Sequence, residues 1–206
     1  MNKVKICFLG LMCVAASWLS GCGGDEVIAT TVTAAEQFEI DKQLIRDYLA
    51  FYQYEEDTTD LGVRLVVVEE GTGNSPEVSD LIYFDYAGRF INQNEDDEII
   101  DTTYFDTTIF SIAAEKQGVD ENDPARYSPI IYTYSSDGWT LTSDSGGIGF
   151  IIGFRDGVTE IMKKLRVGGK GEIIIPSNLA YGPFGVQGIG PNQVLVFEIY
   201  LRRVDK

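Results

Sequence analysis

The three cysteines of this 206-residue chain all lie within its first 22 residues, and this placement limits how the remainder can be held together. No disulfide can form within residues 23–206, and because the chain contains no histidine, a histidine-containing zinc or iron site is excluded as well. The fold must therefore be stabilised by burial of apolar side chains and by hydrogen bonds. The composition allows this, since 44% of the residues are hydrophobic, and the length favours one domain with extensions.

The missing histidine also narrows the chemistry that the chain can perform. A serine or cysteine nucleophile activated by imidazole is excluded, so we expect any chemistry to use carboxylates, hydroxyls, the backbone or shape, with no cofactor. The formal net charge of −16 would repel phosphate backbones and anionic lipids, so nucleic-acid binding is not expected. The acidic segment 120–124 lacks the central glycine of a calcium-binding loop, and we expect no metal site.

The N-terminus has the pattern of an export signal. A short basic start precedes an apolar run over 6–19, which is too short to span a bilayer comfortably. The run ends in Leu-Ser-Gly-Cys at Cys22, which resembles a bacterial lipobox, where the signal is cut before a cysteine that is then lipidated. We expect a signal peptide over 1–21, a lipidated tether over 22–33, and an exported protein held by this lipid anchor only, in the outer membrane on its periplasmic face or at the cell surface. An ordinary secretory signal with a chance cysteine is the alternative.

Residues 34–60 are expected to form an N-terminal helical extension. Apolar residues from Ile40 to Tyr52 recur at helical spacing, which predicts an amphipathic helix with Asp41 on its polar side. The apolar stripe requires a partner, which is either the main domain or a second copy of the chain.

From Leu61 onwards the pattern changes to that of strands. Ile82, Phe84 and Tyr86 share one strand face, and alternate residues of the last strand are expected to point inward. The stretch 107–149 is the least legible part of the chain. The expected strands, followed by one short helix, are 63–68, 81–86, 130–134, 139–142, 172–175 and 194–201, and 155–165.

Five segments between residues 150 and 197 carry the most specific pattern. They are Phe150 to Val158, Arg166 to Pro176, Ala180-Tyr181-Gly182, Gly188 to Asn192 and Leu195-Val196-Phe197. Three earlier segments agree with them: Glu69 to Gly73, Asp85 to Gly88 and Tyr104 to Thr107. In order and spacing these segments resemble the FKBP-type peptidyl-prolyl cis-trans isomerase family, over residues 61–206 with inserted sequence at about 107–149.

The resemblance implies an α+β fold, in which an antiparallel half-barrel sheet of five to six strands wraps around the short helix and leaves an apolar pocket between them. Carried over position by position, it implies catalytic roles for Tyr86, Asp106 and Tyr181. It implies substrate-binding roles for Phe105, Phe150, Ile151, Phe154, Ile189 and Phe197. Phe154 stands where the family often has tryptophan.

The implied activity is isomerisation of Xaa-Pro bonds in proline-containing polypeptides, assisting the folding of exported proteins. The amide must lose its resonance over a barrier of about 18–20 kcal/mol, and this needs neither a nucleophile nor a base. The missing histidine is therefore compatible with this enzyme. Two alternatives stay open: a non-catalytic FKBP-like chaperone or binding module, and a surface lipoprotein scaffold that binds glycan. The latter requires an exposed platform of Trp139, Tyr127, Tyr132 and Tyr134.

Overall fold

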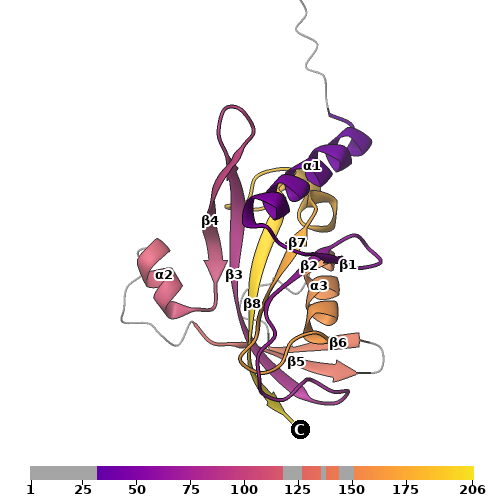
Figure 1. The fold of residues 1–206 in the computed structure, drawn as a ribbon, viewed down its shortest axis with the longest axis vertical. Coiled ribbons are helices and arrows are strands. Elements are labelled where there is room, and N and C mark those ends of the chain that lie inside the picture. Colours follow the sequence, from indigo (N-terminus) through magenta and orange to yellow (C-terminus); the bar gives the residue numbers. More distant parts are fainter. Residues whose placement is uncertain (1–31, 118–126, 136–137, 144–150) are drawn as a thin grey trace, which may run out of the picture. The chain divides into compact units, whose positions relative to one another are not determined.

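The computed structural model describes residues 32–117, 127–135, 138–143 and 151–206. Figure 1 shows the arrangement of its helices and strands. In chain order these are α1 (Ala34–Tyr52), β1 (Asp57–Thr58), β2 (Arg64–Glu69), β3 (Leu81–Gln93), β4 (Ile99–Thr107), α2 (Phe110–Gln117), β5 (Ile130–Ser135), β6 (Gly138–Ser143), α3 (Ile152–Met162), β7 (Lys170–Ile175), the 3₁₀ helices η3 (Ser177–Leu179) and η4 (Gly182–Phe184), and β8 (Leu195–Asp205). In this part of the chain, no helix is both long and apolar enough to cross a membrane.

All strands belong to one antiparallel sheet with the order β1-β2-β7-β8-β3-β5-β6, and β4 also pairs with β3. The expected α+β class, with an antiparallel sheet, a short helix and an N-terminal helix, is confirmed. The described sheet has eight strands instead of five to six. The difference arises because the N-terminal extension supplies β1 and the inserted sequence supplies β5 and β6.

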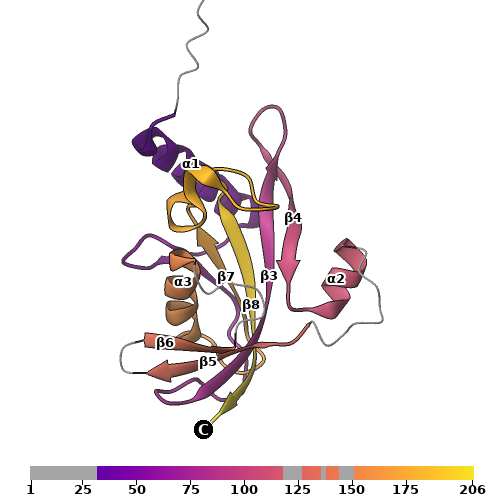
Figure 2. The ribbon, with the colours of Figure 1, turned by 180° about the vertical axis from the view of Figure 1, so that it is seen from behind.

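Each face of the sheet is covered by a different helix (Figures 1 and 2). Ile173 and Ile175 of β7 belong to the core cluster that contains the α3 side chains, whereas Ile174 packs in the cluster that contains the α1 side chains. Neighbouring residues on a strand point to opposite faces. The uninterrupted apolar run of β7 is therefore explained by burial on both sides. The expected inward face of β8, at alternate residues from Leu195 to Leu201, is confirmed.

The helix α1 docks on the main domain, which is one of the two partners expected for its apolar stripe. Ile45, Tyr48 and Leu49 are buried against the sheet. The stripe is rotated from its expected position, since Ile40 is 51% exposed and Asp41 only 1% exposed. The expectation that Asp41 lies on the polar side was wrong.

Asp41 is buried because its carboxylate has two hydrogen-bond donors. It accepts a hydrogen bond from the backbone N–H of Ser177 at 2.7 Å and one from Nε2 of Gln37 at 2.8 Å. A buried carboxylate is tolerated when its oxygens are paired in this way. Asp41 thereby attaches α1 to the start of the loop that joins β7 to β8.

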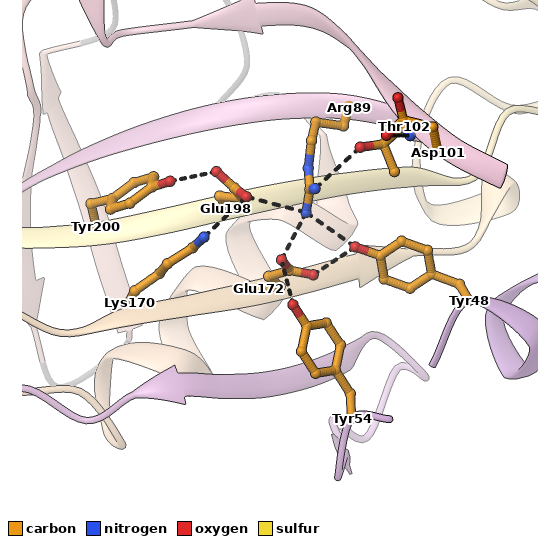
Figure 3. Close-up of polar contacts among 9 residues, drawn as sticks. All are labelled: Tyr48, Tyr54, Arg89, Asp101, Thr102, Lys170, Glu172, Glu198 and Tyr200. Carbon is orange, nitrogen blue, oxygen red and sulfur yellow. Dashed lines mark hydrogen bonds and ion pairs between the residues drawn. The ribbon is translucent and has the colours of Figure 1, made fainter. Parts of the chain in front are cut away.

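A buried polar network lies between α1 and the sheet (Figure 3). Nη2 of Arg89, on β3, lies 2.7 Å from Oε1 of Glu172 and 3.5 Å from Oε1 of Glu198. Glu172 of β7 and Glu198 of β8 are register partners, so two carboxylates face one another and Arg89 lies between them. Tyr48 of α1 joins the network by donating its hydroxyl to Glu172 at 2.8 Å.

The tyrosines of this network predict a loss of stability at high pH. Burial and the nearby Glu172 raise the pKa of Tyr54 from 10.0 to about 12, and burial with Glu172 also raises the pKa of Tyr48. Above pH 10 the unfolded chain loses these protons while the folded protein keeps them, so the free energy of unfolding falls as the pH rises. The stabilisation from Tyr54 is complete below pH 10 and is lost between pH 10 and 12.

Urea unfolding at several pH values in this range measures the decline, and Tyr54→Phe should make it shallower because this variant has no phenol to titrate at position 54. An identical decline in the variant and the wild type would contradict the assignment.

Candidate active site

Aromatic rings from three strands and one helix meet between α3 and the sheet. The ring of Phe197 lies 4.9 Å from that of Phe154, 5.8 Å from Tyr86 and 5.6 Å from Phe105, measured between centroids. Gly88 makes this packing possible, because a Cβ there would lie 2.6 Å from Cζ of Phe105 and 2.9 Å from Cε1 of Phe197. The rings of Phe154 and Phe197 are fully buried and that of Tyr86 almost fully.

The carboxylate of Asp106 is fixed at the edge of this cluster. The hydroxyl of Tyr86 donates to Oδ2 at 2.5 Å, and the backbone N–H of Thr107 donates to Oδ1 at 2.9 Å. Gly88 pairs with Asp106 while the next residue of β3 pairs with Tyr104, so Phe105 is the extra residue of a β-bulge. Bulges redirect side chains and are frequent beside active sites. Here the bulge places Phe105 and Asp106 next to one another on the rim of the cluster.

Two buried threonines hold the β3–β4 junction beneath Asp106. Thr107 donates its hydroxyl to the backbone carbonyl of Tyr86 at 2.8 Å. The Thr108 hydroxyl accepts from the Tyr86 N–H at 2.9 Å and donates to Asp85 at 2.9 Å. The sequence analysis did not identify these residues. The signal that could have found them is the pair of small hydroxyl residues directly after Phe105-Asp106.

A pocket of about 250 Å³ opens beside Asp106. Its far wall is the loop between β7 and β8, which folds back on itself through mutual backbone hydrogen bonds between Val186 and Ile189 of 2.9 and 2.8 Å. Gly185 allows the turn, because its φ is +62° and a Cβ there would lie 2.4 Å from the carbonyl oxygen of Ile189. The lining residues are Phe105, Asp106, Tyr181, Val186, Gln187, Gly188 and Ile189.

A family model described as FKBP-type peptidyl-prolyl cis-trans isomerase matches residues 73–202. The chain belongs to this family. It is 31% identical over 148 residues to the outer membrane protein MIP of Legionella longbeachae, covering 70% of this chain and 45% of that protein. It is 29% identical over 144 residues to the FKBP-type isomerase FkpA of Escherichia coli K12, covering 70% and 38%. The chain thus spans less than half the length of these two relatives.

Two solved structures were also compared with this FKBP-family chain. The crystal structure of FkpA from Escherichia coli has a TM-score of 0.44 and 26% sequence identity, covering 83% of this chain and 62% of that one. A peptidyl-prolyl cis-trans isomerase from Pseudomonas syringae pv. tomato has a TM-score of 0.46 and 20% identity, covering 86% and 99%.

The structure separates the expected FKBP-type site residues into two groups. Four of them, Phe105, Asp106, Tyr181 and Ile189, line the open pocket. The remaining described ones lie behind it in the core, where Tyr86 touches the site through its bond to Asp106: these are Tyr86, Ile151, Phe154 and Phe197. Two further expectations, Phe150 and the lipidated Cys22, lie outside the described residues.

The alternative of a glycan-binding aromatic platform conflicts with the position of Tyr132. This side chain is buried on β5 and packs against Phe84 at 5.4 Å between ring centroids, so it is not available on an exposed surface. The described residues also contain no group of three or more acidic or cysteine side chains that could hold a metal ion.

Proposed function

We propose that the protein catalyses cis/trans isomerisation of Xaa-Pro bonds in polypeptides, in the pocket beside Asp106. One observation carries the proposal. The Asp106 carboxylate is fixed by Tyr86 and Thr107 and faces a pocket that also presents the apolar side chains of Phe105 and Ile189. An immobilised carboxylate next to an apolar surface suits a substrate whose proline ring is apolar and whose amide group changes its polarity as it twists.

The mechanism follows from the barrier itself. A planar amide has the larger dipole and loses more solvation on leaving water, so a water-poor pocket favours the twisted form. Phe105 and Ile189 would hold the proline ring by burial, at about 25 cal/mol per Å². Asp106 would orient carbonyl carbons of the substrate, and the Tyr181 hydroxyl and the backbone N–H of Ile151 would bind carbonyl oxygens. Each tenfold acceleration requires about 1.4 kcal/mol of selective stabilisation of the twisted amide.

The test is cis/trans exchange of an Xaa-Pro peptide measured by NMR, which avoids a coupling protease. We expect the purified protein to accelerate the exchange and Asp106→Ala to lower kcat/KM by about tenfold, which is about 1.4 kcal/mol. Asp101→Ala is the matched control, because Asp101 is exposed on the same strand and lies outside the pocket; it should leave the rate unchanged. Binding of the peptide without acceleration by the wild type would assign the site to a non-catalytic binding module.

We also propose that the chain is exported and attached to a membrane by a lipid on Cys22, with the isomerase domain over 61–206 and the helical extension over 34–60. The support is the N-terminal pattern of a basic start, an apolar run and Leu-Ser-Gly-Cys. A relative is named an outer membrane protein, which agrees with this location. If the anchor exists, Cys22→Ser moves the protein from the membrane fraction to the soluble fraction.

A further inference from the structure

A second pocket, of about 260 Å³, lies between the start of α1 and the β7–β8 loop. We call it the α1 pocket. From α1 and the residue before its cap, Val32, Gln37 and Phe38 line it; from the loop, Asn178, Pro183 and Asn192 line it.

The two pockets lie on either side of the same short piece of chain. Tyr181 lines the pocket beside Asp106, and the next two residues, Gly182 and Pro183, line the α1 pocket. Consecutive Cα atoms are 3.8 Å apart, so the rims of the pockets are neighbours. Phe184 follows directly, and its side chain is 91% exposed. A polypeptide that leaves one pocket towards the other therefore crosses an exposed aromatic ring.

The α1 pocket is held in shape by contacts within the folded domain. The Asp41 carboxylate binds the backbone N–H of Ser177 at 2.7 Å, which fixes the loop to α1. The N–H of Asn192 donates to the carbonyl of Gly182 at 2.8 Å, which closes the loop. A pocket that is already formed binds without the entropic cost of ordering its walls.

The lining of the α1 pocket suits an apolar side chain of an extended polypeptide. Val32 and Phe38 are exposed apolar residues on its rim, and the amides of Gln37, Asn178 and Asn192 can each donate to and accept from a peptide backbone. Asp41 is the charged residue of the lining, and it is already paired, so an ion is not the matching ligand. The volume is below the range of about 300–1,000 Å³ that is typical for small-molecule sites, and it suits a single bulky side chain.

We propose that the two pockets bind one unfolded polypeptide, with its proline beside Asp106 and a bulky apolar side chain of the same chain in the α1 pocket, across Phe184. The inference rests on the proposed function, because it takes the first pocket as the prolyl site. Binding at two linked points raises the affinity for long chains over short peptides. The helix α1 is then part of the substrate-binding surface, and the protein prefers unfolded chains with an apolar residue near proline.

The test compares Phe38→Ser with the wild-type protein. The substrates are a proline tetrapeptide and a longer unstructured peptide that carries one proline and one phenylalanine, the latter placed at increasing distances from the proline. For the best spacing we expect Phe38→Ser to raise KM by about tenfold with kcat unchanged, as for the loss of a buried aromatic contact. Turnover of the tetrapeptide should not change, because it is too short to reach the α1 pocket.

Phe51→Ser is the matched control, since both phenylalanines lie on α1 and are similarly exposed, at 45% for Phe38 and 50% for Phe51. Phe51 does not line the α1 pocket. Replacing the phenylalanine of the peptide by serine should remove the difference between wild type and Phe38→Ser, which makes the comparison a double-mutant cycle. An unchanged KM in Phe38→Ser, or an equal rise in Phe51→Ser, overturns the inference.

Failure of the inference is distinguishable from failure of the proposed function. If the wild type does not turn over the tetrapeptide, the proposed function fails. Fluorescence anisotropy with the labelled longer peptide then still decides the α1 pocket: about tenfold weaker binding by Phe38→Ser, absent from the serine peptide, supports it, and equal binding overturns it.

Discussion

Replacing Arg89 by alanine lowers the free energy of unfolding by about 3–5 kcal/mol, the usual cost of removing one partner from a buried ion pair. Arg89 is the cation between Glu172 and Glu198, which are register partners on adjacent strands and are both buried. Without it, two carboxylates face one another, and only Lys170, 3.1 Å from Glu198, remains to compensate. Urea unfolding of the variant and the wild type measures the loss.

Arg166→Ala is the control for the arginine itself. Arg166 pairs with Glu70 at 3.0 Å, but both side chains are exposed, and surface pairs contribute about 0–1 kcal/mol. The cost of Arg89→Ala should also be smaller in a Glu172→Gln background, since one of the two carboxylates is then neutral. Equal costs for Arg89→Ala and Arg166→Ala would show that the buried network stabilises the protein no more than a surface pair.

Replacing Phe154 by alanine also costs about 3–5 kcal/mol, as expected for a buried aromatic residue. The ring is fully buried and lies within 5.9 Å of the Tyr86 and Phe197 rings, measured between centroids. Its removal leaves a cavity where α3 meets the sheet, directly behind Asp106 and its partner Tyr86. The midpoint of urea or thermal unfolding reports the change.

Phe184→Ala is the matched control, because the same substitution at a 91% exposed position should change stability by no more than about 0.5 kcal/mol. A loss below about 1 kcal/mol for Phe154→Ala would mean that the core closes around the missing ring, and that Phe154 is not the structural centre of the aromatic cluster.

The regular strands and both long helices could be predicted because their signal is local. The alternation of β8 and the spacing of α1 arise from which side each residue presents to the core, and a sequence carries this periodicity directly. The spacing of the motif around Asp106 and Tyr181 likewise identified residues that line one pocket, although they lie far apart in the chain.

The errors concern burial that depends on distant residues. Asp41 sits among polar neighbours in the sequence, and its burial follows from the backbone N–H of Ser177, 136 positions away. Position-by-position comparison placed Phe154 and Phe197 at a pocket surface, whereas their exposure is set by how closely Phe105 and Tyr86 pack over them. The helix α2 gives a weak signal because it is short and its apolar residues form no clear stripe.

The long strand β3 gives the inserted sequence an unusual freedom. It pairs on one edge with β4 as far as Ala87, opposite Thr107, and with β5 from Phe84, opposite Ile130. The chain thus departs from β3 at Thr107 and returns at Ile130 within about 10 Å along that strand. A detour with such close ends can grow or shrink at little entropic cost, so its length is independent of the strand register that positions Asp106. Evolution could exchange this detour like a cassette while the catalytic geometry stayed as it is.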